Sequence, residues 1–188
     1  MGCSIDSISL DLLQRTLGMR LERVLALRYP GYLAYSQVVA TFAGGFSIQV
    51  DLTEVTIAPK FEAFVARVRP IEPPQESEDW DRLAFGDFAI ANTFILRREE
   101  WLNELSKSPA GIQGGHAIEQ RFGDPVEATG GHERLLVDSG ICFISARGAE
   151  LSFDADSFPL VLQMHYEVSS SPMPKGMRIA TVQYNARQ

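Results

Sequence analysis

Three histidines are the residues of this sequence best suited to chemistry. His116 and His132 each end a Gly-Gly-His tripeptide, and Glu119 and Glu133 stand close to them. Two imidazoles and a carboxylate can hold zinc or iron and leave one position open for water. The spacing matches no compact ligand motif, and Leu136 stands where the zinc-protease helix motif requires its second histidine. We therefore expect no metal site and interpret both histidines as solvated, while keeping them as candidate ligand-binding residues.

The third histidine, His165, lies in a segment from residue 158 to 167 that alternates apolar and polar residues. In a strand, this alternation places Gln163 and His165 on one face and Leu162 on the other. We interpret the polar face as solvated. The alternative is a barrel whose interior receives Gln163 and His165, which would then contact a small ligand.

Motifs of the common enzyme classes are absent from the sequence. There is no Gly-x-Ser-x-Gly elbow, Ser-x-x-Lys pair, Walker loop, Gly-x-Gly-x-x-Gly or Cys-x-x-Cys. Asp138 and Asp154 flank β segments, where we expect them to form turns. We therefore predict no catalytic residue and no cofactor. Cys142 stands in an apolar run, and we expect it to be a small buried hydrophobic residue.

The composition restricts the classes of binding partner and the cellular location that we expect. Lys and Arg number 17 and Asp and Glu 24, which gives a net charge of −7. This charge repels phosphate backbones and anionic headgroups, so we expect neither nucleic acid nor membrane as a partner. No apolar stretch approaches the ~20 residues that span a bilayer, and no secretory signal is recognisable. We expect a cytoplasmic protein.

Trp80 is a candidate partner-binding residue. It lies in the acidic segment 71–81, which contains Pro73 and Pro74 and no basic residue. Tryptophan is enriched at binding hot spots, so this segment could bind a basic partner. We favour the other interpretation, in which Trp80 packs on the core and the acids are solvated.

The elements that must position these residues are mostly strands. Apolar spacings of three and four predict one helix from about Leu10 to Tyr29, ended by Pro30. Further on, apolar residues at 46, 48, 50 and 52 alternate with polar ones at 47, 49, 51 and 53, which predicts a strand with one buried and one wet face. Gly44-Gly45 predicts a hairpin with a strand over 38–42, and a break in the alternation predicts a bulge or a short turn at Glu54.

The rest of the chain continues this pattern. Strands are predicted over 61–68, 85–96, 135–137, 141–146, 149–153, 158–167 and 177–184, with a hairpin turn at Arg147-Gly148. A short helix is predicted over 98–105, and the glycine-rich stretch 105–135 is predicted to be an irregular loop.

These elements predict an α+β, mainly β fold. The N-terminal helix should pack on a curved antiparallel sheet, barrel or sandwich of about nine strands. We expect a single domain over 1–188, with segment 71–81 as its one candidate internal boundary. The function we favour is a non-enzymatic protein-binding module of the accessory, inhibitor or immunity type. The alternative is a small-ligand-binding barrel, or an enzyme of a new kind, that uses the 106–134 loop and the polar strand face.

The charge balance yields a direct test. Neither DNA nor RNA should bind at physiological salt, because even non-specific binding depends on neutralising phosphates with basic side chains. An electrophoretic mobility shift assay with duplex and single-stranded probes checks this, and a salt-dependent shift would contradict it.

Overall fold

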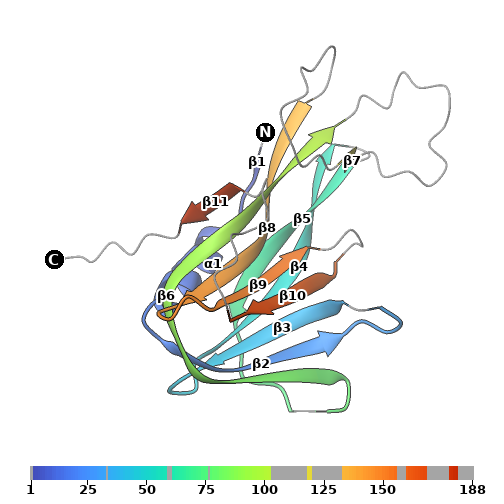
Figure 1. Ribbon diagram of the computed structural model, residues 1–188. Helices are drawn as coiled ribbons and strands as arrows, with labels where there is room; N and C mark the ends of the chain where they lie inside the picture. Colours follow the sequence, from blue (N-terminus) through green and yellow to red (C-terminus); the bar gives the residue numbers. More distant parts are fainter. Residues whose placement is uncertain are drawn as a thin grey trace.

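The computed structural model describes residues 2–32, 34–58, 61–75, 77–102, 118–119, 133–155, 160–168 and 178–181. These residues form one helix and a single sheet of eleven strands (Figure 1). The fold is mainly β with one helix packed on the sheet, as predicted. The elements are α1 (Ser7–Thr16), β1 (Gly2–Cys3), β2 (Arg20–Arg28), β3 (Tyr35–Phe42), β4 (Ser47–Ala58), β5 (Phe61–Pro70), β6 (Trp80–Leu102), β7 (Ile118–Glu119), β8 (Glu133–Ser145), β9 (Glu150–Ala155), β10 (Leu162–Glu167) and β11 (Arg178–Thr181).

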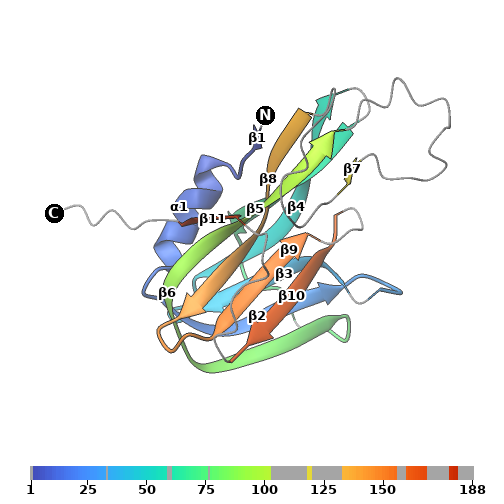
Figure 2. The same ribbon diagram turned by 45° about the horizontal axis from the view of Figure 1, so that its top comes forward.

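The sheet closes into a ring because β6 changes partner along its length. Its first part, Trp80 to Ala89, pairs with β2, and its second part, Ile90 to Leu102, pairs with β8. The ring then runs from β8 through β9, β10 and β3 back to β2. Figures 1 and 2 show the strong bend in β6 that this change requires. Among the described residues, β10 and β3 pair at Leu162 and Tyr35 alone, which is the shortest pairing around the ring.

Aromatic side chains fill the inside of the ring. Phe42, Phe143 and Phe153 are almost fully buried, and the ring centroid of Phe143 lies 6.2 Å from each of the other two. Smaller side chains from β2, β4 and β9 complete the same cluster. The interior is therefore a packed core.

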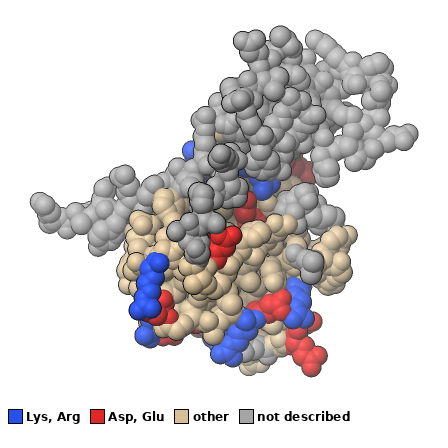
Figure 3. Space-filling model, in the orientation of Figure 1, with Lys and Arg blue, Asp and Glu red and all other residues tan. Residues whose placement is uncertain are grey.

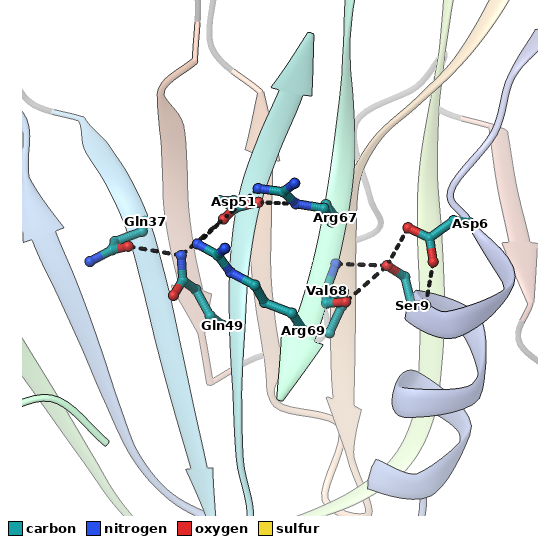
Figure 4. Close-up of polar contacts among 8 residues, drawn as sticks. All are labelled: Asp6, Ser9, Gln37, Gln49, Asp51, Arg67, Val68 and Arg69. Atoms are coloured by element: carbon teal, nitrogen blue, oxygen red, sulfur yellow. Dashed lines mark hydrogen bonds and ion pairs between the residues drawn. The ribbon is translucent and has the colours of Figure 1, made fainter. Parts of the chain in front are cut away.

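Helix α1 is held at the free edge of β5. Asp6 caps the helix by accepting a hydrogen bond from the N–H of Ser9 (2.8 Å). The buried Ser9 hydroxyl lies 2.8 Å from the N–H and 3.0 Å from the carbonyl oxygen of Val68 in β5 (Figure 4). Among the described residues, β5 pairs with β4 alone. One serine thus satisfies two backbone groups that would otherwise be buried without partners.

The predicted N-terminal helix is wrong beyond Thr16. Gly18 adopts a φ of +79°, which ends the helix, and the chain continues as strand β2. Val24 faces the main core, and Leu25 is also fully buried although it lies outside that cluster. A strand covered on both faces has apolar residues at irregular intervals, and these happened to fit the spacing of a helix.

The predicted turns are correct, whereas one predicted bulge is not. Gly44 and Gly45 have φ values of +85° and +82° and join β3 to β4. Gly148 has a φ of +82° in the turn from β8 to β9. The pairing of β4 with β5 passes Glu54 without a break, and its irregularity falls between Thr56 and Ala58. The bulge at Glu54 was therefore wrongly predicted.

Two other predicted elements need correction. Residues 98–102, predicted as part of a short helix, belong to strand β6, whose pairing with β8 supplies the hydrogen bonds that a helix would have made locally. The strand predicted from residue 158 begins at Leu162, because Leu160 has a φ of +60° and is exposed. Residues 156–159, most of 105–132 and the ends of the predicted strand 177–184 lie outside the described residues.

The packing of β8 on β9 depends on Gly140. A Cβ atom there would lie 2.3 Å from the carbonyl oxygen of Phe153 and 2.8 Å from the Cα of Asp154. Gly140→Ala should therefore lower the free energy of unfolding by about 3 kcal/mol, measured by urea denaturation. Gly86→Ala is the control, since a Cβ there meets nothing within 4 Å. Equal stability of the two variants would contradict the assigned pairing.

Candidate functional site

The structure places the predicted site residues apart from one another. Gln163 is half-buried and His165 exposed, both on the face of β10 opposite to the buried Leu162. Trp80 is the first residue of β6. It is half-buried and lies opposite Leu27 of β2. His116 and His132 lie outside the described residues. No described group of three His, Cys, Asp or Glu side chains could share a metal ion.

An open pocket lies where β6 bends. Its volume is about 360 Å³, within the size range of sites that hold small ligands or single large side chains. Three segments form its wall, namely the bend of β6, the turn from β8 to β9, and the end of β10. The lining residues are Ala84, Phe85, Gly86, Asp87, Phe88, Ser145, Arg147, Ala149, Tyr166 and Val168.

A bulge in β6 creates this pocket. Phe88 pairs with Leu21, whereas Ala84 pairs with Arg23, so the intervening residues of β6 outnumber those of β2. Extra residues in one strand disrupt the ladder and sharpen the local bend. The bulge therefore turns β6 from β2 towards β8 and leaves space beside the strand.

Three aromatic rings make the pocket's apolar wall. Phe85 contacts both Phe88 and Tyr166 edge to face, with centroids 5.2 Å apart in each case. Phe88 is buried and anchors the group to the core, while Tyr166 is 41% exposed. The rings thus extend from the core to the surface and present an aromatic wall to whatever enters.

The rim of the pocket is polar on one side and apolar on the other. Arg147 and Asp87 form an ion pair at 2.6 Å, and both side chains are largely exposed. The Ser145 hydroxyl accepts a hydrogen bond from the N–H of Ala149 (2.9 Å). On the opposite side Val168 is 74% exposed. The lining offers shape and apolar contact, and its carboxylate and hydroxyl are already engaged with protein groups.

Asp138 and Asp154 are structural residues within strands, so their prediction as turn residues was wrong. Asp138 is buried in β8, where it accepts hydrogen bonds from the N–H of Ile5 (3.0 Å) and from Nε of Arg97 (2.6 Å). Asp154 in β9 accepts from Ser139 (2.8 Å) and pairs with Arg98. Each carboxylate joins neighbouring segments of the ring.

The face of β4 that was predicted to be wet is also wrongly assigned. Ser47, Gln49 and Asp51 are all buried. Figure 4 shows Arg67 and Arg69 of β5 reaching over this row, where both guanidinium groups lie 2.9 Å from the Asp51 carboxylate. The long arginine stems cover neighbouring polar groups that alternation alone would leave in water.

Cys142 is buried, as predicted. Burial raises the pKa of its thiol to about 12, and a thiol in this state is not a nucleophile near neutral pH. The described helix α1 has ten residues and cannot span a bilayer.

The sequence does not predict the aromatic wall, because Phe85, Phe88 and Tyr166 have the spacing of ordinary apolar strand residues. One signal was available. Gly86 and Asp87 interrupt the apolar alternation between the two phenylalanines, and a glycine within a strand often marks a bulge.

Comparison of the chain with protein-family models, with curated proteins and with solved structures found no match.

The state of Cys142 can be tested by thiol labelling. In a Cys3→Ser variant, the remaining thiol should react with an aromatic disulfide reagent only at the rate of global unfolding, because it is buried and protonated. The same variant in concentrated guanidinium chloride is the control and should react at once. Full labelling of the native protein within minutes would contradict the burial of Cys142.

Proposed function

We propose that this protein acts by binding another protein, and that the aromatic pocket holds an apolar side chain of that partner. The observation that carries the proposal is the position of the pocket. Phe85 and Tyr166, backed by the buried Phe88, form an aromatic wall that reaches solvent, whereas other phenylalanines pack the interior of the ring. Interfaces are commonly anchored by one large side chain in such a pocket.

The surroundings of the pocket favour a macromolecular partner. Tyr166 and Val168, at the end of β10, are exposed apolar residues of the lining. Figure 3 shows that the face over β9 and β10 is mostly uncharged, with a few acidic groups on it. An apolar anchor surrounded by polar groups is the common composition of a protein interface.

The proposed role is non-enzymatic and cytoplasmic, of the accessory, inhibitor or immunity type. The non-enzymatic part of this proposal is supported by the burial and the ion pairs of the side chains that could act in catalysis. The Cys142 thiol is buried, and the Asp87, Asp138 and Asp154 carboxylates are bound to arginines. The net charge of −7 favours a basic partner over nucleic acid.

The second candidate function is binding of a small aromatic molecule. Its specific support is the volume of about 360 Å³, which a compact aromatic ligand could fill. In this case the pocket would bind the free compound and show no preference for peptides.

A randomised peptide library displayed on phage can test the proposal. Selected peptides should share an aromatic or large aliphatic residue, and Val168→Asp should weaken their binding about tenfold or more, because it places a charge at the mouth of the pocket. Dissociation constants from fluorescence anisotropy measure this.

The matched control is Ile8→Asp, since Ile8 is an apolar residue of α1 with a similar exposure of 68%. Equal weakening by both variants, or a library that yields no binder, would overturn the proposal. A screen in which small aromatic compounds bind and peptides do not would favour the second candidate.

A further inference from the structure

Among the described strands, one edge of β10 is almost unpaired where it approaches the pocket. One of its edges pairs with β9 along the whole strand, from Leu162 to Glu167. On the other edge, pairing within the described part of the chain is limited to Leu162 with Tyr35 of β3. Beyond Leu162 that edge runs towards the pocket, whose wall includes Tyr166.

The hydrogen-bond pattern tells which backbone groups face this edge. At the turn from β8 to β9, the N–H of Ser145 donates to the carbonyl oxygen of Ala149 (2.8 Å). Bonded and non-bonded residue pairs alternate along an antiparallel ladder. Counting from this bond, the backbone groups of Ser152 point towards β10, where Ser152 lies opposite His165.

The alternation of backbone direction along β10 then gives the direction of the N–H and carbonyl groups of its other residues. Because His165 directs its N–H and carbonyl to β9, Met164 and Tyr166 direct theirs to the open edge. Leu162 shares this direction, in agreement with its position opposite Tyr35 of β3. Within the described part of the chain, two consecutive bonding positions of this edge therefore have no strand partner.

We infer that the partner binds as an extended segment that adds a strand to the open edge of β10 and places an aromatic side chain in the pocket. This inference rests on the proposed function. Edge pairing supplies main-chain hydrogen bonds, and pockets for alternate side chains supply specificity. This binding mode requires a strand edge and a side-chain pocket. Tyr166 belongs to both, because its backbone groups face the edge and its ring forms part of the aromatic wall.

Two glutamates near the edge of β10 indicate which residues should flank the aromatic one in the bound segment. Glu150 and Glu167 lie directly opposite each other in the β9–β10 ladder, and like charges in this position destabilise a sheet. A strand added beside β10 would bring its own side chain next to Glu167. A basic residue adjacent to the aromatic one would offset the repulsion between the two glutamates.

The same charges argue against a second copy of this chain as the occupant. Pairing between two β10 edges would bring two Glu167 side chains, each with its Glu150 neighbour, onto one continuous sheet. The net charge of −7 adds to this repulsion. The occupant is therefore a basic, aromatic-containing segment of a different protein.

The experiment uses the tightest-binding library peptide and the full chain. The peptide is resynthesised with an N-methyl group at one backbone position at a time, which removes one hydrogen-bond donor. N-methylation should weaken binding about tenfold at alternate positions and less than about threefold at the positions between them, because only alternate groups face β10.

Two measurements on the protein accompany this scan. The amide protons of Met164 and Tyr166 should exchange more slowly with solvent when the peptide is bound. Glu167→Gln should weaken the peptide about threefold at low salt, whereas the exposed Glu72 changed to Gln should have no effect.

The outcomes separate the two proposals. If N-methylation has no alternating effect while Val168→Asp still abolishes binding, the inferred strand addition is wrong and the proposed function stands. If the peptide is insensitive to Val168→Asp, both are wrong. If the chain dimerises through β10, seen as slower exchange at Met164 with rising protein concentration, the second copy is the occupant and the inference is overturned.

Discussion

The change of partner within β6 is the constraint on which the rest of the structure depends. One strand of 23 residues pairs with β2 at its start and with β8 at its end, and among the described strands β6 alone pairs with both. A continuous flat strand could not serve both partners, so β6 bends through a bulge at Phe85–Asp87 and a second irregularity after Ile90. The first bulge directs Phe88 into the core and leaves the pocket beside β6. Closure of the ring and the presence of the candidate site are therefore two consequences of one bend.

Two borders of the sheet are bonded by side chains from other segments, whereas, among the described residues, one edge of β10 is not. At the edge of β5, the Ser9 hydroxyl of α1 bonds both backbone groups of Val68, and the buried carboxylate of Asp138 accepts a hydrogen bond from the N–H of Ile5 next to β1. These polar contacts remove the cost of unpaired backbone groups at two borders of the sheet. The described part of β10 has no such cover after Leu162. An edge that is unpaired among the described strands and lies beside an aromatic pocket is the basis for our proposal that a partner strand binds there.

Much of the fold could be predicted from the residues themselves, and the errors share a physical cause. Gly44-Gly45 and Arg147-Gly148 are correctly predicted turns, because positive φ is a local property of glycine. The strand over 46–52 is also correct. The helix predicted through Leu25 and the wet face predicted at Gln49 are both wrong, since each assumed a strand or helix with one covered face. Leu25 and Gln49 are buried by segments distant in the sequence, and periodicity carries no information about that second layer.

The sequence by itself determined the class of the fold, the acidic charge, the positions of the tight turns and the burial of Cys142, because these follow from local conformational preference and from hydrophobicity. Only the tertiary structure decided that β6 pairs with two strands, that Phe85, Phe88 and Tyr166 meet in one wall, and that an edge of β10 without a partner among the described strands lies beside them. Phe88 and Tyr166 are far apart in the chain, and their contact depends on the register of three strand pairs. Register is set by the sum of packing over the whole sheet, which no single segment of the sequence contains.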